Sequence, residues 1–160
     1  MERDGVESTE SAGPASNKTL CHYWHPVARS SEVADKPFKA KLLNRPLVLW
    51  RSKEQVSVFY DLCIHRGTPL SLGWVDDGEL VCAYHGWRYA GNGSCTGIPS
   101  LPPDRQIPEK ARATAFSAKE RYGLIWVCLD EPRHKIPEFP PEYGDPASVQ
   151  IGRASCRERV

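Results

Sequence analysis

Two short stretches decide the fold of this chain: Cys-Ile-His-Arg-Gly at residues 63–67 and Cys-Ala-Tyr-His-Gly-Trp at residues 82–87. Each stretch offers one thiolate and one imidazole, and sixteen residues separate His65 from Cys82. The Cys-x-His spacing of the first stretch sends both side chains to the same side, since alternate residues of an extended chain point the same way. We expect Gly67 and Gly86 to let each loop bend tightly around a metal, because glycine tolerates backbone angles that other residues resist.

The two stretches predict a metal centre with four ligands: Cys63, His65, Cys82 and His85. A Rieske [2Fe–2S] cluster uses this ligand set, with two cysteines on one iron and two histidines on the other. Two cysteines and two histidines can also bind one tetrahedral zinc ion. Zinc fingers usually open with two cysteines and close with two histidines, whereas each stretch here is mixed. Loops without a metal are the remaining alternative.

The residues around the ligands resemble those of the Rieske iron–sulfur family, in His-Arg-Gly-Thr-Pro-Leu at 65–70 and Tyr-His-Gly-Trp at 84–87. The resemblance implies that Cys63 and Cys82 hold an inner ferric ion. It also implies that His65 and His85 hold the outer iron through Nδ1, with their Nε2 edges facing outward.

Four positions indicate which kind of Rieske protein this chain resembles. High-potential members carry an extra cysteine in each stretch, and these two cysteines form a disulfide; the matching places here hold Thr68 and Tyr84. Those members also place a serine hydroxyl near the cluster sulfur, where this chain has Trp87, while Tyr89 matches their tyrosine. Fewer hydrogen bonds to sulfur stabilise the reduced cluster less, so we expect a reduction potential near the low end of the Rieske range, about −150 mV.

Flanking segments narrow the resemblance to the N-terminal part of Rieske non-haem iron oxygenase alpha subunits, the group that includes vanillate O-demethylase, phthalate dioxygenase and pheophorbide a oxygenase. The resemblance spans about residues 20–143 and rests on the two stretches and four further segments: Trp24–Ala28, Pro46–Arg51, Cys95–Pro99 and Tyr122–Val127. It implies a terminal mono- or dioxygenase that hydroxylates or O-demethylates an aromatic or related compound, with O₂ and NAD(P)H-derived electrons. It further implies an NAD(P)H-dependent reductase or a ferredoxin as electron donor, and a homo-oligomer for the full-length form.

The family's second domain, which holds a mononuclear Fe(II) on two histidines and one carboxylate, has no counterpart in these 160 residues. Its helix typically reads Asp/Glu-x-x-His-x-x-x-x-His, and the only histidine after His85 is His134. Such a site leaves open positions for O₂. We therefore predict that this chain carries the electron-transfer part of an oxygenase and no catalytic residue. A stand-alone Rieske-type ferredoxin is the alternative.

The sequence predicts four segments. Residues 1–18 are polar and charged and are predicted to be a disordered extension. Residues 19–135 are predicted to form the Rieske domain, and residues 136–149 the Pro-rich start of the missing catalytic domain. Residues 150–160 are predicted to be the translation of a sequencing adapter, because the DNA that can encode Ile151–Val160 resembles one. A natural basic tail is the alternative.

Composition excludes several classes of partner. The net charge is +1, with acidic and basic residues mixed along the chain, which argues against a nucleic-acid partner. We expect no membrane span, because no apolar run approaches the required length, and no secretory signal. Apart from the two ligands and Cys156, three cysteines remain at scattered positions: Cys21, Cys95 and Cys128. Unpaired thiols are typical of a cytoplasmic protein.

The pattern along the chain predicts an all-β domain of small antiparallel sheets with two cluster-binding loops. Apolar and β-branched residues recur in five short segments: Phe38–Leu43, Leu47–Arg51, Val56–Tyr60, Leu80–Tyr84 and Tyr122–Leu129. We expect Arg112–Ala118 to pair with the last of these. Asp77-Gly78 and Asn92-Gly93 are hairpin turn signals. Four prolines in Ile98–Pro108 predict an irregular covering loop.

Overall fold

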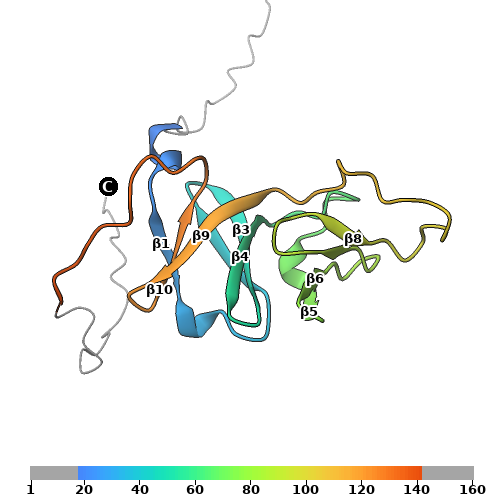
Figure 1. The fold of residues 1–160 in the computed structure, drawn as a ribbon, viewed down its shortest axis with the longest axis horizontal. Coiled ribbons are helices and arrows are strands. Elements are labelled where there is room, and N and C mark those ends of the chain that lie inside the picture. The colour runs from blue at the N-terminus through green and yellow to red at the C-terminus, as the bar shows by residue number, and fades with distance from the viewer. Residues whose placement is uncertain (1–17, 142–160) are drawn as a thin grey trace, which may run out of the picture.

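The computed structural model describes residues 18–141, and this part of the chain is built almost entirely of antiparallel strands (Figure 1). The larger sheet has six strands, in the order β1 (His25–Arg29), β10 (Leu124–Cys128), β9 (Ala115–Arg121), β4 (Gln55–Tyr60), β3 (Arg45–Ser52) and β2 (Phe38–Leu42). The smaller sheet has four, in the order β5 (Trp74–Asp76), β6 (Glu79–Val81), β7 (Arg88–Tyr89) and β8 (Cys95–Gly97). The helical elements within residues 18–141 are three 3-10 segments, η1 (Lys18–His22), η2 (Ser30–Glu32) and η3 (Leu70–Leu72). The all-β prediction is confirmed.

Strand β3 explains how the two sheets share one body. Leu47 and Leu49 belong to a core that the edge strands β1 and β2 also line, so the larger sheet curls around it. Val48 and Trp50 belong to a second core, beneath the smaller sheet. Successive side chains of a strand point to opposite faces, so both faces of β3 are covered and four consecutive residues are fully buried.

The smaller sheet forms a lobe to the right of the larger sheet in Figure 1, and the lobe carries both ligand-bearing stretches. Its β5–β6 hairpin turns at Asp77 (φ 48°) and Gly78 (φ 75°), as the Asp-Gly signal predicts. The Asn-Gly signal is confirmed too: Gly93 has φ 86°, and the chain turns there between β7 and β8. The segment 98–108 is irregular, with Ile98 and Ile107 packed against the core of the lobe.

Two predicted strands begin or end elsewhere. The strand predicted for Leu80–Tyr84 ends at Val81, so Cys82 lies in a loop. The strand predicted for Tyr122–Leu129 begins at Leu124, because Tyr122 (φ 57°) and Gly123 (φ 67°) form the hairpin turn into β10. A tight hairpin needs positive φ at both turn residues, and this requirement outweighs the strand preference of tyrosine. The strand that pairs with β10 is β9, which starts three residues later than predicted.

The first and last described segments pack together on the outer face of the larger sheet. The indole N–H of Trp24 donates to the carbonyl of His134 at 2.9 Å, and the ring of His134 stacks on Tyr23 at 4.4 Å. Ile136 is buried against Trp24 and Trp126, so contacts of the sheet extend past residue 135. Most of the predicted extension (1–18), most of the predicted Pro-rich start (136–149) and all of the predicted adapter translation (150–160) lie outside the described residues.

Candidate metal centre

The two ligand-bearing stretches fold into loops of the same backbone design, here called loop 1 (residues 62–69) and loop 2 (residues 82–87). In loop 1, the amide of Cys63 donates to the carbonyl of Thr68 and the amide of Gly67 donates to the carbonyl of Cys63, both at 2.8 Å. Loop 2 repeats both bonds at 2.9 and 3.0 Å, between Cys82 and Trp87 and between Gly86 and Cys82. The two glycines have φ of +71° and +68°, which confirms that each loop needs a left-handed residue there.

The four predicted ligands converge with sulfur inside and imidazole outside. Cys63 and Cys82 are each only 2% exposed and belong to the core of the lobe. His65 and His85 are exposed, and the centroids of their rings lie 4.8 Å apart. The fold therefore brings two thiols and two imidazoles from distant loops to one place.

The electrostatic setting of the ligands follows from this placement. Burial raises the pKa of the Cys82 thiol, and the neighbouring Cys63 thiol raises it further. Partial desolvation lowers the pKa of His65, and His85 and Arg66 lower it further. The lowered pKa of His65 favours the neutral imidazole, which is the form that ligates metal, while the thiols must lose protons when a metal binds.

Aromatic rings from loop 2 surround the ligands. The ring of Trp87 stacks on His65 at 4.8 Å with an interplanar angle of 6°, so Trp87 packs over loop 1. The ring of Tyr84, which is 60% exposed, lies 3.8 Å from that of His85. Tyr84 and Trp87 each cover part of an imidazole ring, and we assign neither a chemical step.

Tyr89 lies beneath loop 1, with its hydroxyl oxygen 3.1 Å from Cys63 Sγ. Burial raises the pKa of this phenol, so the O–H is retained. A thiolate ligand carries no proton, so Tyr89 is the donor whenever Cys63 holds a metal. The sequence matches this tyrosine to that of high-potential Rieske proteins, and the structure adds that Tyr89, which follows loop 2, contacts the predicted ligand of loop 1.

Sequence reasoning missed the residues that support the loops. Asp61, two residues before Cys63, is buried, and its carboxylate accepts hydrogen bonds from Ser71. Arg88, which follows loop 2, donates to the carboxylates of Glu79 and Asp76 at 2.7 and 2.8 Å. A carboxylate at the end of the apolar strand β4, just before a ligand, was the available signal for the first.

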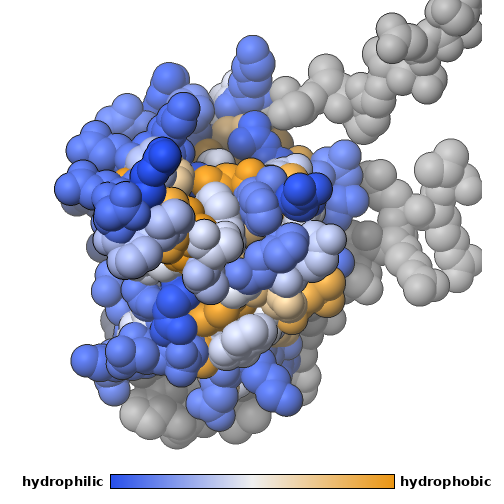
Figure 2. Space-filling model, turned by 90° about the vertical axis from the view of Figure 1, so that its right-hand side faces the viewer, coloured by the Kyte–Doolittle hydropathy of each residue, from blue (hydrophilic) through white to orange (hydrophobic). Residues whose placement is uncertain are grey.

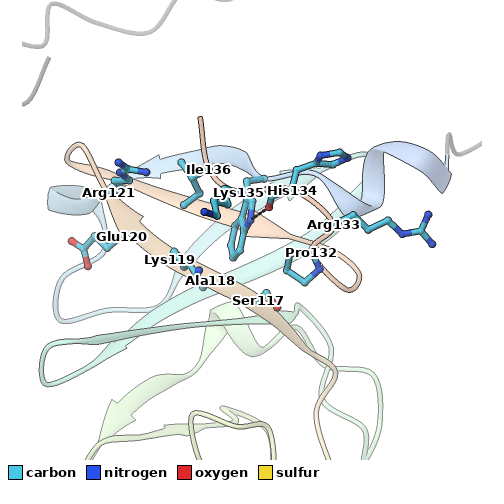
Figure 3. A pocket seen from close by; sticks show the side chains of 11 residues that line it. Ser117, Ala118, Lys119, Glu120, Arg121, Pro132, Arg133, His134, Lys135 and Ile136 are labelled. Atoms are coloured by element: carbon cyan, nitrogen blue, oxygen red, sulfur yellow. Dashed lines mark hydrogen bonds between the residues drawn. The ribbon is translucent and has the colours of Figure 1, made fainter. Parts of the chain in front are cut away.

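A groove of about 720 Å³ lies elsewhere, between β9 and the last described segment (Figure 3). Its walls carry four cationic side chains, which are Lys119, Arg121, Arg133 and Lys135. Trp24 lines it as well, and Lys119 Nζ lies 5.3 Å from the centroid of its ring. None of the four predicted ligands lines this groove, so the candidate centre is at the loops of the lobe.

Within residues 18–141, no three or more His, Cys, Asp or Glu side chains gather so as to hold a single metal ion. A Rieske cluster does not need such a group, because each of its irons has only two protein ligands. In the same range, no helix has the length and apolar character needed to cross a membrane.

An all-β domain with two matched Cys/His loops defines a class of iron–sulfur electron-transfer domain. The profile of the Rieske [2Fe–2S] domain matches residues 23–117, and the chain belongs to this family. A [2Fe–2S] cluster is therefore its cofactor, and the buried thiols, the paired imidazoles and the phenol at Cys63 fit that group.

Its relatives include a demethylase and a dioxygenase subunit. The chain is 41% identical over 117 residues to methylxanthine N1-demethylase NdmA of Pseudomonas putida, covering 69% of this chain and 33% of that protein. It is 36% identical over 129 residues to the phenoxybenzoate dioxygenase subunit alpha of Ectopseudomonas oleovorans, covering 80% and 32%. The solved structure of NdmA from Pseudomonas putida CBB5 superposes with a TM-score of 0.72 at 37% identity, covering 79% and 40%. The chain thus spans about a third of the length of these curated relatives.

Proposed function

We propose that this chain is the electron-transfer part of a terminal oxygenase that hydroxylates or O-demethylates an aromatic or related compound. One observation carries the proposal: two loops of equal backbone geometry present two buried thiols and two exposed imidazoles, in a chain whose relatives are oxygenase subunits. A stand-alone ferredoxin is not favoured, because those relatives are two to three times longer than the matched region.

Cys63 and Cys82 would hold the inner iron, and His65 and His85 the outer iron. A [2Fe–2S] cluster bound in this way supplies one-electron chemistry. The protein would then do three things at these atoms. It keeps water from the sulfur side by burying both cysteines, it donates a hydrogen bond from Tyr89 to Cys63 Sγ, and it leaves both imidazoles exposed.

The surface beside the imidazoles suits a protein partner. Figure 2 looks onto the end of the molecule that is on the right in Figure 1, and apolar patches appear there among hydrophilic side chains. In this lobe the exposed large apolar side chains are Leu62, Ile64, Leu72, Trp74 and Tyr84. Leu62 and Ile64 flank Cys63, and Tyr84 adjoins His85. Exposed apolar groups rimmed by polar ones are typical of protein–protein contact, and electrons would pass through the imidazole edges here.

The remaining parts of the proposal concern the whole enzyme. A reductase that uses NAD(P)H, or a ferredoxin, would supply the electrons. A mononuclear Fe(II) in a downstream domain would activate O₂, and the full-length protein would be a homo-oligomer. We propose a cytoplasmic location, which the three described cysteines outside the ligand set support, because Cys21, Cys95 and Cys128 form no disulfide.

Reconstitution with iron and sulfide tests the proposal. The 160-residue chain should be red-brown, bind two irons and accept electrons from a reductase, yet oxidise no aromatic substrate. A colourless protein that holds one zinc ion would overturn it. Sequencing the genomic DNA beyond the codon for Val149 distinguishes the oxygenase from the ferredoxin, because only the oxygenase continues into a helix with two histidines and a carboxylate.

A further inference from the structure

The two loops are closed differently at their bases. Loop 2 is the tip of the β6–β7 hairpin, where Leu80 lies opposite Tyr89 and Val81 lies opposite Arg88. A backbone ladder therefore holds both ends of loop 2. Loop 1 follows β4, which ends at Tyr60, and the chain returns as the 3-10 segment η3 rather than as a strand. Something other than a strand pair must fix the base of loop 1.

Asp61 stands at this position and is 6% exposed. Its Oδ1 accepts the backbone N–H of Ser71 and its Oδ2 accepts the hydroxyl of Ser71, both at 2.7 Å. Residues 61 and 71 bracket loop 1, so the two bonds close the loop across its base. We call this pair of bonds the Asp61–Ser71 clasp.

The backbone of Asp61 is fixed on the other side as well. Its N–H donates to the carbonyl of Pro46 at 3.0 Å, which extends the β3–β4 ladder by one bond. The next amide, of Leu62, donates back to the carbonyl of Tyr60 at 2.7 Å, which makes a three-residue turn centred on Asp61. Asp61 is thus the residue at which the chain leaves the larger sheet, and Cys63 follows two residues later.

A buried carboxylate is costly to desolvate unless hydrogen bonds satisfy it. Hydrogen bonds from a hydroxyl or an amide to an ionised carboxylate are shorter and stronger than bonds between neutral groups. Both carboxylate oxygens of Asp61 accept bonds from one residue, so the arrangement fixes the position of Ser71 relative to Asp61.

We propose that Asp61 is a positioning residue for the metal centre: through its clasp on Ser71 it holds loop 1 where Cys63 and His65 meet their counterparts of loop 2. The assignment of a cluster to these loops rests on the proposed function. The positioning itself concerns the protein's own backbone and is measurable without a cluster.

The test compares three variants of the 160-residue chain. Asp61→Ala removes both bonds, and Ser71→Ala removes only the hydroxyl bond. Asp61→Asn keeps an acceptor for the Ser71 amide and offers an N–H₂ to the Ser71 oxygen. After reconstitution, Asp61→Ala should lose its cluster about 10-fold faster than wild type, as is typical when a supporting partner of a ligand is removed. Its EPR signal and midpoint potential should also change. Ser71→Ala should show a smaller effect, and Asp61→Asn should restore the EPR signal.

Val127→Ala is the matched control, because Val127 is fully buried in the core of the larger sheet, away from the lobe. At an equal loss of melting temperature, this variant should keep the wild-type EPR signal and potential. The proposal is overturned if Asp61→Ala keeps the wild-type signal, potential and rate of cluster loss, or if Val127→Ala changes them equally.

A second measurement separates this proposal from the proposed function. In metal-free protein, Asp61→Ala should speed hydrogen exchange at the amides of Cys63 and Gly67 in loop 1 and leave those of Cys82 and Gly86 in loop 2 unchanged. A uniform change in both loops, or none, refutes the positioning role. A chain that binds no [2Fe–2S] cluster but shows this selective exchange would refute the function and leave the positioning role standing.

Discussion

Loop 1 and loop 2 present the same ligand pair on the same backbone pattern, yet they are supported in different ways. Loop 2 is part of a hairpin and is held by neighbours in sequence. Loop 1 depends on residues outside it. Asp61 accepts hydrogen bonds from Ser71 in η3. From the β6–β7 hairpin, Tyr89 contacts Cys63 and Trp87 stacks on His65. The difference teaches that one metal centre can join a half held by a hairpin to a half held by side chains from other segments of the chain.

The surroundings of the two glycines show a second difference. A Cβ placed on Gly67 would have no atom within 4 Å, so loop 1 is open there. A Cβ placed on Gly86 would lie 3.1 Å from Cγ of Pro99, because the covering segment packs against loop 2. Loop 2 is therefore crowded on its outer side, and loop 1 is not.

Replacement of either cysteine should have the largest effect, and it should be equal for the two loops. Cys63→Ser and Cys82→Ser should each reduce bound iron from two per chain to almost none, because in the proposed ligand set both thiolates would bond to the same iron. Iron content and the visible spectrum measure this. Cys21→Ser is the control, since Cys21 lies in the core of the larger sheet. Cys95→Ser should also keep the cluster, and its loss there would show that the ligand assignment is wrong.

Alanine at the two glycines should separate the loops by stability. A left-handed backbone costs an L-residue about 1–2 kcal/mol, so Gly67→Ala should lower the free energy of unfolding by about that amount. Gly86→Ala should cost roughly 1 kcal/mol more, because Pro99 must also move. Urea unfolding gives both values. Equal losses would mean that the covering segment does not press on loop 2.

Tyr89→Phe should act on loop 1 alone and more weakly. It removes the hydroxyl that lies 3.1 Å from Cys63 Sγ. A hydrogen bond to a ligand sulfur stabilises the reduced, more negative cluster, so its loss should make the midpoint potential more negative by about 20–60 mV, the equivalent of one ordinary hydrogen bond. Protein-film voltammetry measures the shift. A shift to more positive potential would contradict this role of the phenol.

The ion pair beside loop 2 should give the smallest effect. Its hydrogen bond to Arg88 holds the pKa of Glu79 below the ordinary value of 4.5. A lowered folded-state pKa adds stability above the unfolded-state value, and this stability is lost as the pH falls through the folded-state pKa. Glu79→Gln should therefore lower the melting temperature by about 1–3 °C at pH 7 and by less below pH 4. Thermal melts of both proteins across this range test the sign, and a difference that grows in acid would contradict it.

The parts that the sequence predicts well are local. The two loops, their glycines and the Asp-Gly and Asn-Gly turns each depend on a few adjacent residues with restricted backbone angles. The strands β2, β3 and β4 of the larger sheet could be predicted within two residues, because apolar residues mark them, whereas β9 begins three residues later than predicted. The turn at Tyr122-Gly123 was missed as well, since tyrosine has no turn signature and pairing with β9 sets the turn there.

The parts that could not be predicted depend on distant contacts. Nothing in the sequence says that Asp61 reaches Ser71, that Trp87 covers the imidazole of the other loop, or that Pro99 meets Gly86. Each contact joins segments whose relative position is set only by packing of the lobe on β3. The roles of the four ligands stay predictions, as do the boundaries of the terminal segments.

The contact between η1 and the last described segment has a mechanical consequence. The first and last described segments both lie at the larger sheet, on the side away from the lobe in Figure 1, and Trp24 and Tyr23 contact His134. A pulling force applied to these two segments would act first on their contacts with each other and next on the β1–β10 pair. The lobe lies outside this path, so loops 1 and 2 would bear tension last, and the predicted ligands would stay unstrained.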